Sequence, residues 1–186
     1  MRYSQDHKAQ THQRIVKEAS VRFRRDGIAA TGLQPLMKAL GLTHGGFYAH
    51  FPSKQALVET ALQDAAAEMD QSTAKVMDTA APIDALIERY LSEAHRDHPE
   101  LGCPLPTIAA ELGQRGEPSE TTDQFVRSRL AKIAKHLQGE DTKARATVML
   151  SSLIGALVLS RSVQDPALSQ RILEDAKRLL KDSVEG

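Results

Sequence analysis

The chain has 186 residues, of which 41% are hydrophobic and 26% charged, as is typical of a soluble globular protein of one or two domains. Its single cysteine, Cys103, excludes an intrachain disulfide and a cysteine-based metal site, and it suits a reducing cytoplasm. The net charge is zero, but residues 1–60 carry nine basic and four acidic side chains, a charge of +5, which leaves −5 on the remainder. This asymmetry favours a polyanion-binding N-terminal segment.

Helical periodicity predicts a first helix over about residues 8–26, which Gly27 ends in a left-handed conformation. A short second helix follows. Thr31 and Gln34 match a capping box at its start, and Gly41 closes it.

Residues 43–54 are the most informative segment of the chain. Thr43 is a good N-cap for a very short third helix with two glycines, which stops at Pro52. Ser53 then caps a long fourth helix that extends to about residue 77. Two short helices joined by a turn with glycine form the helix-turn-helix pattern.

Beyond a break at residues 79–82, further helices and no convincing strand are predicted. The most apolar stretch, residues 148–159, is too short to span a bilayer, and the N-terminus lacks the apolar core of a signal peptide. We therefore expect a cytoplasmic protein with no membrane partner. The helix around this stretch is apolar nearly all round, so it must be covered on more than one side. The helices of this part are expected at residues 83–94, 107–112, 121–137, 142–164 and 166–182.

One segment resembles the helix-turn-helix and fourth-helix start of the TetR/AcrR family of bacterial transcriptional repressors. It reads Leu40-Gly-Leu-Thr-His-Gly-Gly-Phe-Tyr-Ala-His-Phe-Pro-Ser-Lys-Gln-Ala-Leu57. The resemblance is strong over about the first 60 residues, and the remainder agrees in helix number and order.

The resemblance implies an all-α fold of about nine helices. Residues 1–56 would form a three-helix DNA-binding domain, and residues 57–186 a larger domain for ligand binding and dimerisation. It also implies a homodimer that represses transcription by binding a palindromic double-stranded DNA operator and leaves it when a small-molecule inducer binds.

Tyr48, His50 and Lys54 match positions that contact phosphates in the family. Lys54 lies in the first turn of its helix, where free N–H groups and the helix dipole add to its attraction for phosphate. Thr31 is a further candidate, because its hydroxyl lies near a helix N-terminus, although a capping role explains it equally well.

Thr43, His44 and Gly45 lead the recognition helix, whose N-terminal residues reach base edges in the major groove. Glycine within a helix is unfavourable, by about 1 kcal/mol relative to alanine. A close approach of the backbone to DNA is one reason for Gly45, and the demands of the turn are another.

Residues expected to line the ligand pocket are Tyr90, Cys103, Phe125, Met149 and Leu153. Cys103 has two interpretations. A neighbouring protonated histidine, His95 or His98, would lower its pKa and make it a thiol sensor, or it is a small buried apolar residue. The two histidines lie three residues apart but supply only two ligands, so no metal is expected.

Enzyme motifs are missing from the sequence, which has no glycine-rich phosphate loop, no His-Glu-x-x-His and no Gly-x-Ser-x-Gly. We therefore expect neither catalysis nor a cofactor. Two alternatives stay open: a redox or electrophile sensor that acts through Cys103, and a helical dimeric adaptor that does not bind DNA.

Overall fold

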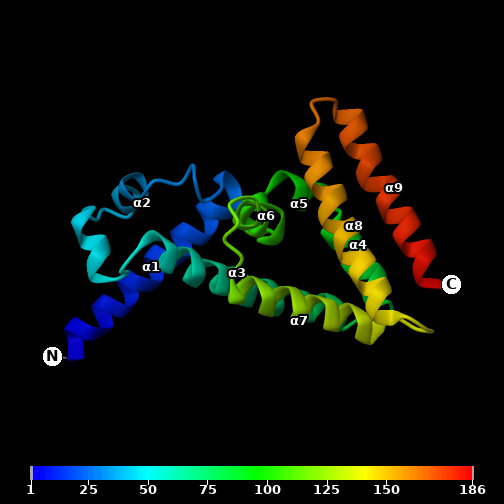
Figure 1. Cartoon of the computed structure of the whole chain (residues 1–186), viewed down its shortest axis with the longest axis horizontal. Coiled ribbons are helices and arrows are strands. Elements are labelled where there is room, and N and C mark those ends of the chain that lie inside the picture. The colour runs from blue at the N-terminus through cyan, green and yellow to red at the C-terminus, as the bar shows by residue number, and fades with distance from the viewer. Residues whose placement is uncertain (1, 186) are drawn as a thin grey trace.

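A computed structural model describes residues 2–185, with side chains described for residues 6–184, and all regular structure within that part is helical. A small head and a larger body share one long helix, α3 (Lys54–Met77) (Figure 1). The head also contains α1 (Arg2–Asp26), α2 (Leu33–Ala39) and the 3₁₀ turn η1 (Gly45–Ala49). The body contains α4 (Pro82–Tyr90), α5 (Glu93–Asp97), η2 (Pro99–Leu101), the π turn η3 (Leu105–Ala109), α6 (Ala110–Gln114), α7 (Glu120–His136), α8 (Thr142–Ser162) and α9 (Pro166–Glu185). The expected all-α fold with an N-terminal helix-turn-helix is confirmed.

The start of α2 differs from the expected capping box. Its N-cap is Gly32, with no side-chain hydrogen bond, and the Thr31 hydroxyl donates instead to the carbonyl of Gly27 at 2.7 Å. Thr31 is only 4% exposed, because it faces the core and closes the turn after α1. Gly27 itself has the left-handed φ of +88° that was expected of it.

The turn between the two short helices agrees with the prediction from the sequence better than the start of α2 does. Gly41 is left-handed, with φ +72°, and the Thr43 hydroxyl accepts the N–H of Gly46 at 3.2 Å. The short third helix is a 3₁₀ turn rather than an α-helix, since glycine favours helix poorly and five residues give it little length. Ser53 caps α3 as expected, accepting the N–H of Ala56 at 3.1 Å.

Two hydrophobic clusters divide the molecule differently from the expected boundary at residue 56. The head cluster surrounds Phe47 and continues along α3 to Leu62, and it takes in Ile108 and Leu112 from the body. The first half of α3 thus packs in the head and its second half in the body, so residue 56 lies inside a continuous helix.

The body cluster is built from α4, α7, α8 and α9. One face of α8 is buried in it, whereas Val148 and Leu159 on α8 and Leu179 on α9 are exposed. The whole helix, which contains the apolar stretch 148–159, has 21 residues and by length and composition alone is able to cross a membrane. The core helix of a soluble protein passes the same test.

A half-buried histidine, His95 on α5, ties the end of α4 to the segment after η2. Nε2 of His95 accepts the backbone N–H of Cys103 at 3.0 Å, and Nδ1 lies 2.7 Å from the carbonyl oxygen of Tyr90. Because an amide can only donate and a carbonyl can only accept, the ring is the neutral tautomer with its proton on Nδ1. Burial lowers the pKa of His95 to about 4. We call these two hydrogen bonds the His95 clamp.

Gly102→Ala should break the clamp, because a Cβ at this position would collide with Nε2 of His95. Leaving the Cys103 N–H buried and unpaired should lower the free energy of unfolding by about 1–3 kcal/mol. Urea denaturation measures this change. The control is Gly113→Ala, where a Cβ meets no atom within 4 Å. It should be neutral or stabilising by up to about 1 kcal/mol, and equal losses in the two variants would contradict the clamp.

Acidification should weaken the fold through His95. Between the ordinary pKa of 6.5 and the folded-state pKa of about 4, only the unfolded chain takes up a proton at this residue. Stability is therefore lost as the pH falls through this window, by at most about 1.4 kcal/mol per pH unit. Urea denaturation from pH 7 to 4.5 should show this loss in the wild type and in His7→Gln, at an exposed position. The loss should be smaller in His95→Gln, where only other groups with a lowered pKa, such as His50, contribute. The same slope in all three proteins would refute the assignment.

Candidate nucleic-acid interface and ligand cavity

Four of the residues expected to bind DNA lie together at the outer edge of the helix-turn-helix. Thr43, His44 and Gly45 are exposed, and Tyr48 is 58% exposed. The imidazole of His44 meets the Tyr48 ring edge-on, with centroids 5.8 Å apart. Hydroxyl and imidazole groups therefore gather on one protruding edge, where they are able to donate to phosphates and bases.

Gly45 is not required by the turn. Its φ is outside the left-handed region, and a Cβ placed on it would meet no atom within 4 Å. Gly46 is more confined, since its Cβ would lie 3.3 Å from the hydroxyl oxygen of Thr43. Of the two reasons considered for Gly45, close approach of another molecule to the backbone agrees better with this open space.

His50 is half-buried beside α1, and its Nδ1 has no hydrogen-bond partner. Its ring centroid is 6.1 Å from that of His12. Burial lowers the pKa of His50, and charge repulsion from His12 and Lys8 lowers it further. The shift favours the neutral ring, which offers an N–H rather than a positive charge.

Lys54 lies at the junction of head and body. Its ammonium donates to the carbonyl of Ile28 at 2.5 Å, and burial lowers its pKa. This bond engages one of the three N–H donors of the half-buried ammonium, so two donors remain for a phosphate. Thr31 is buried and its hydroxyl is already engaged, so the structure does not support its expected contact with phosphate.

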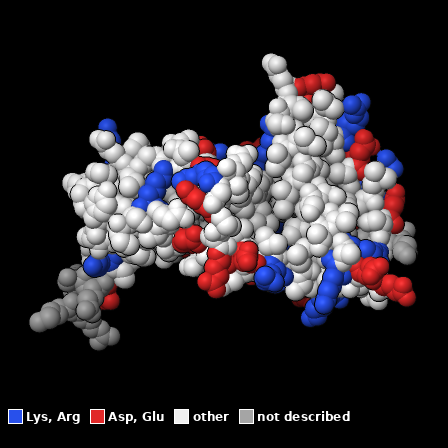
Figure 2. All heavy atoms as spheres, viewed as in Figure 1, with Lys and Arg blue, Asp and Glu red and all other residues white. Residues whose placement is uncertain are grey.

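Charges on the surface follow the asymmetry of the sequence. In Figure 2 the acidic side chains lie mostly over the body and the junction. Lys8, Arg14, Lys17 and Lys38 are exposed on the helices of the head. Arg14 also donates to the carbonyl of Leu40 at 3.0 Å, which ties α1 to the end of α2.

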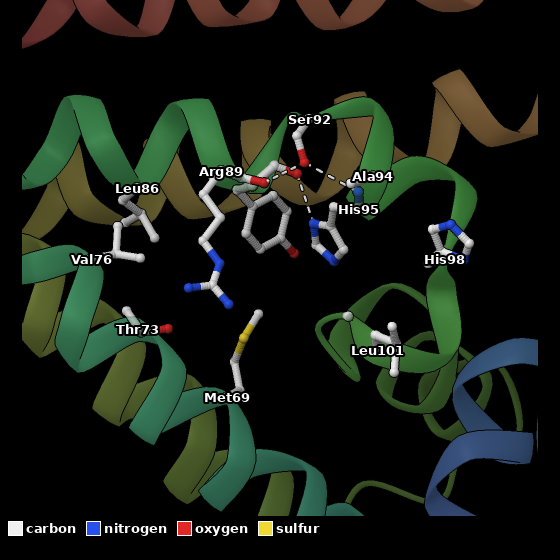
Figure 3. Close-up of a pocket in the computed structure, with 12 residues that line it drawn as sticks. Met69, Thr73, Val76, Leu86, Arg89, Ser92, Ala94, His95, His98 and Leu101 are labelled. Atoms are coloured by element: carbon white, nitrogen blue, oxygen red, sulfur yellow. Dashed lines mark hydrogen bonds between the residues drawn. The ribbon is translucent and has the colours of Figure 1, made fainter.

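The body contains two adjoining cavities. The outer one, of about 240 Å³, lies between α3, α4 and the α5–η2 segment (Figure 3). The inner one, of about 20 Å³, lies deeper against α7 and α8. Their walls share four residues: Met69, Thr73, Leu86 and Tyr90.

Three of the five residues expected to line a pocket do so. Tyr90 lines both cavities, and Cys103 and Leu153 line the inner one. Phe125 and Met149 do not line either cavity as predicted, because both lie in the hydrophobic core of the body. Apolar positions on a helix look alike in sequence, so periodicity placed these two inside the body without saying which faced a space.

Arg129 is a cavity residue that the sequence did not reveal. Only 7% of it is exposed, and it donates from Nη1 to the Thr73 hydroxyl at 2.9 Å and from Nη2 to Asp70 at 2.7 Å. Its guanidinium carbon lies 4.9 Å from the centre of the Phe125 ring. Charges on α7 resemble a solvated helix face in sequence, and only its position against α3 and its burial distinguish Arg129.

Cys103 is buried, and burial raises the pKa of its thiol. Of the two interpretations of Cys103, the small buried residue agrees with the structure, because His95 is neutral and its Nε2 accepts the Cys103 N–H. A thiol of this kind is poorly ionised. Among the described residues, no group of three or more His, Cys, Asp or Glu side chains is placed to hold a metal ion.

Polar contacts join the head to the body. The Glu111 carboxylate on α6 accepts the N–H of Ile28 at 2.6 Å and that of Ala29 at 2.8 Å, just after α1. From α1, the buried Arg24 donates to the carbonyl of Gly102, on the wall of the outer cavity, at 3.2 Å. Movement of the cavity wall is therefore mechanically connected to α1.

Comparisons with known proteins agree with this geometry. Residues 13–61 match the model of bacterial regulatory proteins of the tetR family, and residues 84–185 match the tetracyclin repressor-like C-terminal domain. None of the curated proteins is a significant sequence match.

Solved structures of similar fold include proteins from three bacteria, two of them TetR-family regulators. A regulator from Chloroflexus aurantiacus has a TM-score of 0.81 at 23% identity, over 97% of this chain and 96% of that one. The reduced form of Escherichia coli NemR has a TM-score of 0.76 at 20% identity, over 93% and 96%. A Cytophaga hutchinsonii regulator has a TM-score of 0.76 at 21% identity, over 95% and 96%. At these identities the likeness establishes the fold, and the two family matches, which together span most of the chain, establish the kinship: the chain belongs to the TetR family of bacterial transcriptional regulators.

Proposed function

We propose that the protein is a cytoplasmic repressor that binds a palindromic operator as a homodimer and releases it when a small molecule occupies the body. The observation that carries this proposal is the exposed edge of Thr43, His44, Gly45 and Tyr48. It combines polar groups with a glycine that no internal contact requires.

Each residue of this edge has a proposed role. Thr43, His44 and the Gly45 backbone meet base edges, as residues at the start of a recognition helix do. Tyr48 donates to a phosphate, which sets the register without reading sequence. Lys54 acts as a second phosphate contact through the N–H donors that Ile28 leaves free, and His50 contributes a neutral N–H.

Dimerisation is proposed through α8 and α9. Val148, Leu159 and Leu179 are large apolar side chains left exposed on these two helices. A second copy of the chain would cover them with the same two helices, which gives a four-helix interface related by a two-fold axis. The two heads would then lie about one DNA turn apart, roughly 34–36 Å, as a palindrome requires.

Coupling between ligand and DNA is proposed to run along α3 and the head–body contacts. Met69 and Thr73 of α3 line the cavity, and the same helix begins in the head. Glu111 on α6 accepts the N–H of Ile28 in the head, and Arg24 on α1 donates to Gly102 on the wall of the outer cavity. A ligand that binds better to a second arrangement of these elements shifts the population towards it, by as much as its two affinities differ.

The two alternative functions, a thiol sensor and a helical adaptor, require different properties of the protein. Thiol sensing requires an ionised, accessible cysteine, whereas Cys103 is buried with a raised pKa. A helical adaptor would not bind DNA, so DNA binding itself distinguishes it from a repressor.

The DNA test uses an electrophoretic mobility shift with fragments obtained by selection of bound genomic DNA. Tyr48→Phe removes one donor to a phosphate and should weaken binding by about 3–10-fold, the loss of roughly 1 kcal/mol. His44→Ala should weaken binding and relax sequence preference. Affinity should fall steeply with salt, since phosphate contacts release counterions.

The matched control is His136→Ala on α7 of the body, which should bind like the wild type. Failure to select any genomic fragment would exclude the repressor and favour the adaptor. Equal binding by the His44 and His136 variants would remove His44 from the interface.

Glu111→Gln tests the head–body link. The glutamine amide keeps one acceptor oxygen, but an NH2 group replaces the other oxygen and faces the N–H of Ile28 or Ala29. Because hydrogen bonds to a charged group contribute about 1.5–3 kcal/mol, the free energy of unfolding should fall by that order. The amides of Ile28 and Ala29 should also exchange hydrogen faster. Glu120→Gln, at an exposed position, is the control, and unchanged exchange in the Glu111 variant would show that the link carries little energy.

A further inference from the structure

The ligand class follows from two buried groups that lack a nitrogen or oxygen partner, on the premise that the body cavity controls the regulator. The Tyr90 hydroxyl has only the weakly hydrogen-bonding thiol of Cys103 beside it, although Tyr90 is only 6% exposed. Nε of Arg129 is likewise buried without a partner. Both residues line the inner cavity, and a buried donor without an acceptor is unfavourable. A ligand that brings acceptor oxygens to this place would satisfy both.

The charge around these groups favours an anion. Arg89 lines the outer cavity, Arg129 and Lys132 line the inner one, and none of the described residues lining either is an Asp or Glu. Asp70 lies behind them and forms 2.7 Å ion pairs with both Arg129 and Lys132. One carboxylate thus faces two cations, which leaves one positive charge in a partly buried setting. A single negative charge on the ligand would balance it.

The outer cavity sets the size and character of the ligand. An apolar cavity of about 150 Å³ admits benzene. The outer cavity, at about 240 Å³, therefore has room for a substituted aromatic ring. Met69, Leu86 and Leu101 supply apolar walls (Figure 3), and sulfur and aromatic edges favour a ring. Tyr90 is held in place by the edge of His95, at 4.7 Å between ring centroids.

We propose that the two cavities bind a small aromatic monocarboxylate. Its ring lies in the outer cavity, and its carboxylate lies at the junction with the inner cavity. There it accepts hydrogen bonds from the Tyr90 hydroxyl and from Nε of Arg129. Arg89, whose side chain extends between α3 and α4 (Figure 3), adds to the attraction at the mouth. The inner cavity, about the size of one water molecule, accommodates no more than a single polar group.

The test is isothermal titration calorimetry of the full chain at pH 7.5. The probes are benzoate and 3-phenylpropanoate, their neutral amides benzamide and 3-phenylpropanamide, and the cation benzylamine. At least one carboxylate should bind ten-fold or more tightly than its own amide, and benzylamine should bind least. Tyr90→Phe should weaken carboxylate binding about 3–10-fold, and Arg129→Gln by at least ten-fold.

Arg127→Gln is the matched control, because Arg127 lies on the same helix with its side chain largely exposed, and it should bind the carboxylates like the wild type. Thermal unfolding of each variant checks that it folds, and the conservative Tyr90→Phe keeps the test valid if Arg129→Gln does not. The proposal would be overturned if neither carboxylate bound saturably. It would also be overturned if an amide or benzylamine bound as tightly as the carboxylates, or if Tyr90→Phe left the carboxylate affinity unchanged.

The mobility-shift assay separates this inference from the proposed function. DNA binding without carboxylate binding would leave the regulator intact and reject the ligand class. Carboxylate binding without DNA binding would keep the site and reject the repressor.

Discussion

Backbone groups at the junction of head and body impose the central constraint on this structure. The chain leaves α1 at Gly27, so the N–H groups of Ile28 and Ala29 have no partner in a regular element. The Glu111 carboxylate accepts both, from a helix more than 80 residues further along the chain. Docking of α6 on the head is therefore not simply hydrophobic, and it holds the start of the helix-turn-helix in a fixed relation to the body.

A second set of contacts extends this constraint to the cavity. Arg24 reaches from α1 to the carbonyl of Gly102, and the adjoining N–H of Cys103 is bound by His95. His95 in turn is anchored to the carbonyl of Tyr90, which lines both cavities. Three hydrogen bonds and the peptide bond between Gly102 and Cys103 thus connect the proposed ligand site to the first helix of the head. Such a network is able to bias two arrangements of the molecule without any long-range charge effect.

Local signals predicted the fold well where they act over a few residues. Ser53 caps α3, Gly41 turns the chain between the short helices, and α4 begins at Pro82 after the expected break. Thr31 shows the opposite case. Its spacing to Gln34 fits a capping box, in which its hydroxyl would accept a backbone N–H, but the buried hydroxyl donates to the carbonyl of Gly27 instead. A motif of two residues does not reveal which partner the folded chain will offer.

The sequence by itself determined the helical class, the helix-turn-helix and the polar edge from Thr43 to Tyr48, because these depend on neighbours in the chain. Only the tertiary structure decided that Lys54 turns towards Ile28, that His95 is neutral, and that Arg129 and Tyr90 meet at a cavity. These features depend on burial and on partners from distant helices. Desolvation and hydrogen-bond geometry, which have no local signature in sequence, set the state of each group.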